Sequence, residues 1–190
     1  MLASNALTTI MKVRRSLGFE DDSKDEFIIE TVNTASQIIE RYCNRKFKRQ
    51  EYTDIALMES DEYLFSQYPV HQVIAIGDRP LESPKADLES GILFHRVSAH
   101  QTIQYIAGYD LPNSEAYMNS SHPLPPDVEK ACLKLVQQLY EDDEMVSAAD
   151  MGLLKSVDMG DMKVQLQSGN MAAIPIDVAQ LLVSHRKMNL

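Results

Sequence analysis

The stretch Thr102–Tyr109 (TIQYIAGY) is followed, after a polar loop, by Leu124–Ala131 (LPPDVEKA). The first stretch is rich in Ile and Tyr and reaches a glycine near its end, which is typical of a β-strand that runs into a turn. The second places proline just inside the start of a segment with helical periodicity, where helices accept proline most readily. Together the two stretches predict a strand-to-helix corner in a mixed α+β protein.

Residues 51–109 have the composition and the period of short strands. Runs of Val, Ile, Tyr and Phe are separated by turn residues such as Gly, Pro, Asp and Ser. The separating segments are too short for the crossovers that parallel strands need, so we expect antiparallel pairing. The predicted strands are Tyr52–Met58, Glu62–Phe65, Val73–Ile76, Gly91–Arg96 and Thr102–Ala107.

An amphipathic helix is predicted before this β region. Ser23–Glu26 (SKDE) has the pattern of a capping box, and Asn44 is the expected end of the helix. Apolar residues recur at spacings of three and four, which places them on one helical face: Ile28, Val32, Ala35, Ile39 and Tyr42. The polar residues that we expect to face solvent are Glu30, Gln37, Glu40 and Arg41.

A second amphipathic helix is predicted from Pro125, and the acidic run Glu141–Glu144 is expected to end it. Its apolar stripe consists of Val128, Ala131, Cys132, Leu135, Val136 and Leu139. A hairpin is predicted within Leu153–Leu166, and a last helix over Ile176–His185. The predicted fold is thus α+β in one domain: a helical body (1–49 and 124–148), an inserted antiparallel β region (50–109), and a C-terminal hairpin and tail (150–190).

The helical stripes have two interpretations. An amphipathic stripe is buried either in the core of its own chain or against another subunit, and the pattern is the same in both cases. The residues that we consider as candidates for subunit packing are Ile28, Val32, Ile39, Leu135 and Leu139.

The composition excludes some classes of function. A formal net charge of -10 argues against a surface that binds nucleic acid, which needs clustered Lys and Arg. The one strongly basic cluster, Arg45–Arg49 (RKFKR), is expected to complement the end of a helix; a nucleic-acid-binding module built on it is the alternative. No window is long and apolar enough to span a bilayer, and the first 17 residues lack a signal pattern, so we expect a soluble protein without a membrane partner.

Catalytic and metal-binding patterns are missing from the sequence. Cys43 and Cys132 each lie in a predicted amphipathic helix and are expected to be reduced core thiols. The best metal candidate is the pair His95 and His100 across a hairpin, which does not have the spacing of a metal motif. We therefore expect no cofactor and no enzymatic activity. A small α+β ligand-binding or enzymatic domain, with a pocket near these histidines and Tyr105, is the alternative.

Four stretches, Ala35–Phe47, Tyr68–Ile76, Tyr105–Tyr109 and Leu124–Val128, follow one another in a distinctive order and together span most of the chain. In this order they resemble the head-tail connector (head-completion adaptor) family of long-tailed bacteriophages. Counterparts of the family's later turn and short C-terminal helix lie at Gly152–Gln165 and Val178–Arg186. The loop Asp110–Pro123 departs from the family pattern and is where we would look first for a partner that other members do not share.

The resemblance implies a structural protein in the neck of the virion, made in the host cytoplasm. Members of this family form a ring of about twelve copies below the portal, extend the DNA channel, and present a platform to a tail-side neck or stopper protein. DNA passes through such a channel without sequence-specific binding. An apolar segment at a chain terminus is suited to docking on a partner. Together with the resemblance it predicts portal docking through the C-terminal segment, with the candidates Ile176, Leu181, Leu182, Val183 and Arg186. Another neck or tail-completion protein is the alternative within the same class.

Overall fold

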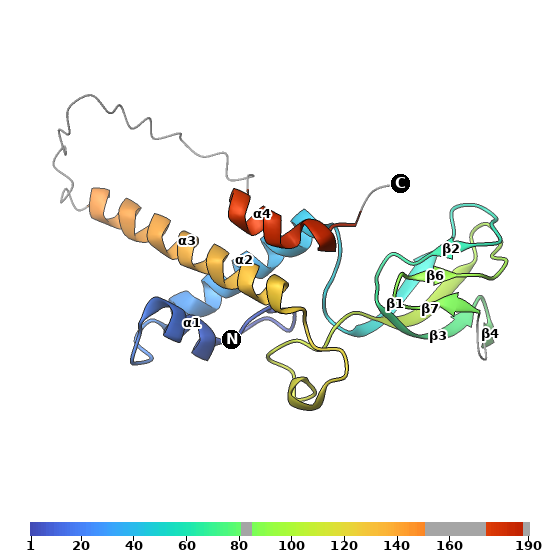
Figure 1. The fold of residues 1–190 in the computed structure, drawn as a ribbon, viewed down its shortest axis with the longest axis horizontal. Coiled ribbons are helices and arrows are strands. Elements are labelled where there is room, and N and C mark those ends of the chain that lie inside the picture. Colours follow the sequence, from blue (N-terminus) through green and yellow to red (C-terminus); the bar gives the residue numbers. More distant parts are fainter. Residues whose placement is uncertain (81–84, 151–173, 188–190) are drawn as a thin grey trace, which may run out of the picture.

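The computed structural model describes residues 1–80, 85–150 and 174–187. The chain forms a helical body and a β region that lie side by side along the long axis of the molecule (Figure 1). The helical body contains α1 (Ile10–Leu17), α2 (Asp25–Cys43), α3 (Pro126–Asp150) and α4 (Ile176–Leu182), with a 3-10 turn η2 (Val183–His185) after α4. The α+β class predicted from the sequence is confirmed.

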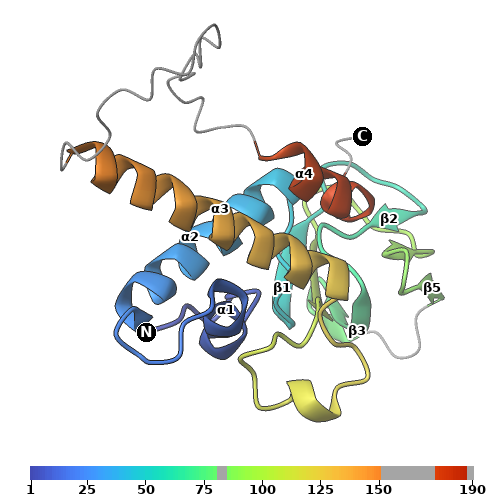
Figure 2. The same ribbon diagram turned by 60° about the vertical axis from the view of Figure 1, so that its left-hand side comes forward.

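Helix α3 organises the helical body, because α1, α2 and α4 all pack against it. Its proline start and the apolar stripe after it are as predicted, and the stripe faces the predicted stripe of α2 in one core. Between them lie fully buried residues from both helices, among them Val32, Ile39, Val128 and Cys132. Figure 2 shows α2 and α3 crossing with α4 laid along one side of the pair.

The β region contains two small antiparallel sheets with a core of their own. The larger sheet has the strand order β1-β7-β3-β4, and the smaller one has the order β2-β6-β5. The strands are β1 (Gln50–Ile55), β2 (Tyr63–Leu64), β3 (Val70–Ile76), β4 (Arg79–Pro80), β5 (Ala86–Asp87), β6 (Ile92–Leu93) and β7 (Thr102–Ala107). The predicted antiparallel pairing is confirmed, and β7 is the strand predicted from the opening stretch of sequence.

The central residue of this second core is Tyr105. It lies opposite Tyr52 of β1 and Val73 of β3, and its ring is fully buried against Phe65. Its hydroxyl donates a 2.9 Å hydrogen bond to Asp54 Oδ2, and the amide of Gln67 donates to the same hydroxyl. Burial next to this carboxylate raises the pKa of Tyr105 well above its usual value. The buried tyrosine is thereby satisfied by hydrogen bonds and fixes where the two sheets meet.

The β region leaves and rejoins the helical body at a single place. The amide of Tyr109 donates to Phe47 O (2.7 Å), and the amide of Arg49 donates to Tyr109 O (2.8 Å). Lys48 and Tyr109 form a parallel bridge between the outgoing and returning chains. Because the two ends of the β region are hydrogen-bonded to each other, the region is inserted as a compact unit and α2 and α3 stay packed together.

Several expected boundaries differ from the structure. Helix α2 begins at Asp25 with Lys24 as its N-cap, so the predicted capping box is wrong: the Ser23 hydroxyl instead donates to Asp21 Oδ1. The end of α2 is as expected, with Asn44 in the left-handed conformation. Helix α3 continues through Glu141–Glu144 to Asp150, because acidic residues near the C-terminal end of a helix weaken it only slightly.

Other elements were missed or lie outside the described residues. Helix α1 was not predicted, although Thr9 caps it by accepting from the Lys12 amide and Gly18 ends it in the left-handed conformation. The short strands β4 and β5 were also missed, and the predicted strand Gly91–Arg96 is reduced to β6. The hairpin predicted within Leu153–Leu166 lies outside the described residues, whereas the helix predicted over Ile176–His185 is confirmed as α4 and η2.

Candidate functional site

The C-terminal segment is part of the helical body. Val178 and Leu182 of α4 are fully buried and belong to the same core as α2 and α3. On the outer side, Lys134 Nζ donates a 2.5 Å hydrogen bond to Asp177 Oδ2, and this bond lowers the pKa of Asp177. Helix α4 is therefore attached to the helical body in two ways. Its inner face is buried in the shared core, and on its outer side Asp177 forms an exposed ion pair with Lys134 of α3.

The tail beyond α4 crosses the joint between the two parts of the molecule. His185 Nε2 donates to Asp127 Oδ2 at 2.7 Å, close to the start of α3. The amide of Lys187 donates to Cys43 O (2.8 Å), and its Nζ reaches Ser66 O (3.3 Å) in the β region. Arg186 lies over the ring of Tyr42, with its guanidinium 4.8 Å from the ring centre. The tail thus contacts both the end of α2 and the β region.

The five portal-docking candidates have different surroundings. Ile176 and Val183 are exposed, at 79% and 68% of their surface, and Arg186 is exposed beside Tyr42. Leu181 is half-buried, and Leu182 is fully buried in the core of its own chain. In this fold Ile176, Val183 and Arg186 are therefore the candidates whose side chains are accessible from outside, while Leu182 anchors the helix in the core.

The candidates for subunit packing lie mostly inside the chain's own core. Ile28, Val32, Ile39 and Leu135 are all buried between α2 and α3, and Leu139 is half-buried beside them. The apolar faces of these two helices thus pack against each other within one chain. Of the five candidates, Leu139 keeps surface that another copy can contact.

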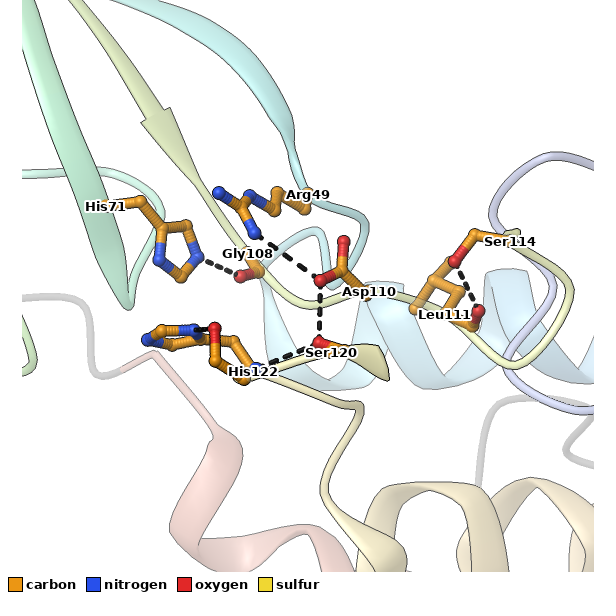
Figure 3. A network of polar contacts seen from close by, with 9 residues as sticks. Arg49, His71, Gly108, Asp110, Leu111, Ser114, Ser120 and His122 are labelled. Carbon is orange, nitrogen blue, oxygen red and sulfur yellow. Dashed lines mark hydrogen bonds and ion pairs between the residues drawn. The ribbon is translucent and has the colours of Figure 1, made fainter. Parts of the chain in front are cut away.

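The loop Asp110–Pro123 is fastened to the β region by a network of polar contacts (Figure 3). Asp110 and Pro123 form a parallel bridge, and the Asp110 carboxylate accepts from Ser120 Oγ (2.7 Å) and from Arg49 Nη1 (3.4 Å). Within the loop, Ser114 Oγ donates to Leu111 O, and a 3-10 turn, η1 (Tyr117–Asn119), forms its tip. The loop is therefore an ordered surface feature closed at its base.

Two histidines meet at the base of this loop. His71 Nε2 donates to Gly108 O at 2.6 Å, and the His71 ring packs edge to face against His122 with ring centres 4.4 Å apart (Figure 3). Burial lowers the pKa of His71, and the nearby Arg49 adds to this effect. Both rings line a groove whose other walls include Leu88, Glu89 and Tyr109. Sequence reasoning missed this pair because strand β3 and the loop are distant in the chain.

The basic cluster Arg45–Arg49 is used inside the fold. Arg45 is buried, its guanidinium lies 3.8 Å from the centre of the Tyr68 ring, and it donates a hydrogen bond to Tyr68 O. Lys46 Nζ bonds Glu40 Oε2 (2.7 Å), and Phe47 is fully buried. Arg49 is bonded to Asp110, as described above. Three of the four cations thus have partners within the fold. The half-buried Lys48 is the one whose side chain forms no hydrogen bond or ion pair with the described residues, and a single unpaired cation is not a strip of positive charge for a phosphate backbone.

Glu40 was expected to face solvent, and this expectation is wrong. Its side chain is buried, and Oε2 accepts from Asn5 Nδ2 (2.9 Å) as well as from Lys46. The cover comes from the segment before α1, which folds back over α2: the amide of Leu7 donates to Ser36 Oγ, and the amide of Ala3 donates to Asn33 Oδ1. Helical periodicity of α2 alone carries no signal for such a cover.

The histidines and cysteines considered in the sequence can be placed in the fold. No group of three or more His, Cys, Asp or Glu residues is placed to hold a metal within residues 1–80, 85–150 and 174–187. His95 and His100 are exposed. Cys43 and Cys132 are free, buried thiols, as predicted, and burial raises their pKa to about 11 and about 12. In the same part of the chain, none of the helices combines the length and apolarity of a membrane-crossing segment.

A model of a known protein family matches the chain over nearly its whole length. The family model described as head completion protein matches residues 6–188, which includes both cores, the loop at residues 110–123 and the C-terminal segment. The chain belongs to the head completion protein family. Members of this family are structural proteins, and the expectation that the chain is not an enzyme is confirmed on that ground. No curated protein sequence matches this head completion protein.

Solved structures share the fold of this head completion protein over the full chain. A chain in the neck of an empty gene transfer agent particle, computed with C6 symmetry, superposes with a TM-score of 0.57 at 18% identity. A chain in the neck of the native particle, computed with C12 symmetry, gives 0.56 at 16%, and one in the virion of the native particle gives 0.59 at 17%. Each match covers 100% of this chain and 94% of the other. At these identities the likeness concerns the fold.

Proposed function

We propose that this head completion protein forms a ring of about twelve copies below the portal of a phage-like particle, where it extends the DNA channel and joins head to tail. The observation that carries the proposal is the family match over residues 6–188. It is supported by the full-length likeness to two chains in particle necks, whose reconstructions have C6 and C12 symmetry. The protein is a component of the virion neck.

The charge of the chain suits a channel that DNA passes through. With a formal net charge of -10, its surface repels phosphate more than it attracts it. The basic residues Arg45, Lys46 and Arg49, which would be the natural contacts with DNA, already have partners in the fold. DNA bound to the wall of a channel would be held back, whereas a repelling wall lets it slide.

The exposed face of the C-terminal segment is the surface that we propose for the portal. Ile176, Val183 and Arg186 are exposed there, and the buried Leu182 anchors α4 in the helical core. Such anchoring reduces the entropy lost on binding, which favours a preformed docking element. The tail-side neck or stopper protein would then bind elsewhere on the ring, for which the ordered loop at residues 110–123 is our candidate.

The experiment is negative-stain electron microscopy of the protein mixed with the portal protein encoded beside it. We expect a ring at the narrow end of the portal. The charged variants Ile176→Asp and Val183→Asp should lose portal binding, and Met118→Asp, a matched change at an exposed methionine of the loop, should keep it. A ring on the tail side of a different neck protein would instead indicate a stopper or tail-completion protein, and no association with any neck component would overturn the proposal.

A further inference from the structure

The turn between β1 and β2 presents an unusual combination of exposed side chains. Leu57 and Met58 are 86% and 71% exposed, and they stand in the same turn as the exposed carboxylates of Asp61 and Glu62. Neither carboxylate forms a hydrogen bond or an ion pair with the described residues, and Asp61 interacts with Arg96 only at longer range. Glu59, in contrast, is bonded to Arg96. The turn therefore presents two exposed apolar side chains next to two carboxylates that have no direct hydrogen-bond or ion-pair partner among the described residues.

A surface of matching chemistry lies on α1. Met11 is 77% exposed, and Arg15 is exposed four residues later, which places both on the outward face of the helix. Val13 faces the core from the other side. Arg15 makes no hydrogen bond or ion pair within the part of the chain that the structure describes, whereas its neighbours do: Lys12 pairs with Glu129 and Arg14 with Asp25. This face combines apolar area with a free positive charge.

The two surfaces lie on opposite flanks of the molecule. Figure 1 places α1 in the helical body and β2, which follows the turn, at the far end of the long axis. The two therefore do not meet within one chain. A ring of identical copies needs this arrangement, because each head-to-tail interface joins one surface of a copy to a different surface of the next.

We infer that the turn at residues 57–62 of one copy packs against the Met11 and Arg15 face of α1 in the next copy. The inference rests on the proposed ring and names its subunit interface. Apolar contact between Leu57, Met58 and Met11 supplies the buried area, and methionine is enriched in such interfaces. The pairing of Asp61 and Glu62 with Arg15 sets the register and disfavours like-charged alternatives.

Cysteine cross-linking tests the contact directly. The double variant Met11→Cys, Met58→Cys carries both halves of the interface in one chain, and the native thiols Cys43 and Cys132 are buried and so give little background. We expect a ladder of disulfide-linked oligomers on a non-reducing gel, from portal-bound rings or from concentrated protein. Neither single variant should give this ladder, nor should the control pair Met58→Cys, Ile176→Cys.

A charge exchange tests the same interface without a cross-link. Arg15→Glu should weaken association of the copies about tenfold, and adding Asp61→Lys and Glu62→Lys to that variant should restore it. Rings that form at the portal without a ladder, and with no effect of Arg15→Glu, would overturn this interface and leave the proposed function standing. A ladder without portal binding would support the interface and count against the portal. Absence of both rings and ladder would overturn both.

Discussion

Gly108 occupies the point where the chain leaves and re-enters the helical body. Its φ of +103° lies in the region that favours glycine, and a Cβ added there would stand 2.5 Å from the backbone oxygen of Lys48. The neighbouring oxygen of Phe47 would lie at 2.8 Å. The two chain segments run so close together at this residue that no side chain fits between them.

Gly108→Ala should therefore lower the free energy of unfolding by about 3 kcal/mol, since both backbone strain and a backbone clash must be relieved. Gly18→Ala is the matched control, because Gly18 also has a positive φ but nothing within 4 Å of an added Cβ. We expect a loss of about 1 kcal/mol for the control, from strain alone. Urea unfolding measures the free energy of unfolding of both variants. Equal losses would contradict the role of the close contact between Gly108 and the backbone of residues 47 and 48.

The His71 side chain makes the stability of the protein depend on pH. Burial lowers its pKa in the folded state, and the groups that face it are Arg49, His122, Asp110 and the Gly108 carbonyl. The unfolded chain then binds more protons than the folded chain below the usual histidine pKa, so stability falls as the pH falls through that range. Thermal unfolding from about pH 7.5 to about pH 5.5 should show this decline. His71→Gln should flatten the decline, and an unchanged slope would assign it to other groups.

Helix α4 is the element whose role changes most between sequence and structure. The sequence marks it as an apolar terminal helix, suitable for docking on a partner. In the fold its inner face, Val178 and Leu182, belongs to the core, whereas Ile176 at its start and Val183, the first residue of η2, are exposed. One short helix thus serves stability on one side and can serve recognition on the other. Removing the whole segment would mix the two effects, because it would expose the core of α2 and α3.

Substitutions on the two faces separate these roles. Leu182→Ala should lower the free energy of unfolding by about 2–5 kcal/mol, because it leaves a cavity in a packed core. Val183→Ala, one residue later on the exposed side, should change it by less than about 0.5 kcal/mol. Chemical unfolding of the two variants measures the difference. A small effect of Leu182→Ala would mean that α4 is only loosely attached and free to leave the body.

At the scale of the whole molecule, two cores are joined through one narrow connection. The helical core and the β core consist of separate sets of buried residues. Between them lie the paired chain ends at Phe47 and Tyr109, the stacked Arg45 and Tyr68, and the tail residue Lys187. These contacts orient the β region without merging its core with that of the helices.

The helical body should therefore fold without its insert. Replacing residues 50–107 with a short Gly-Ser linker keeps the bonded ends at Phe47 and Tyr109 close together, so the loop closure costs little. We expect helical circular dichroism and a cooperative thermal transition, at a lower temperature than for the full chain. A chain that loses its helicity would show instead that the two parts fold as one cooperative unit. The same variant tests the domain organisation expected from the sequence.

Patterns along the chain predicted the elements that depend on local chemistry. The periodic apolar residues located α2, α3 and α4, and the Ile and Tyr run before Gly108 located β7. The patterns failed to predict caps and burial where these depend on particular contacts in the folded chain. Ser23 has the residue type of an N-cap, but its hydroxyl bonds Asp21, and Glu40 is covered by a segment more than thirty residues earlier. Short strands such as β4 and β5 carry too few residues for a pattern and form only against their neighbours.

Sequence alone predicted the α+β class and the short β insert between two amphipathic helices, because these follow from residue type and period. Its motifs also resembled the family that the family comparison then confirmed. It did not reveal which side of each stripe meets another chain. Ile28, Val32, Ile39 and Leu135 turned out to fill their own core, and Arg45 to lie in the joint. The same apolar or charged residue has the same pattern whether its partner is in its own chain or in the next. Only the packed structure, which shows the exposed faces of α1, of α4 and of the turn at residues 57–62, distinguishes the two.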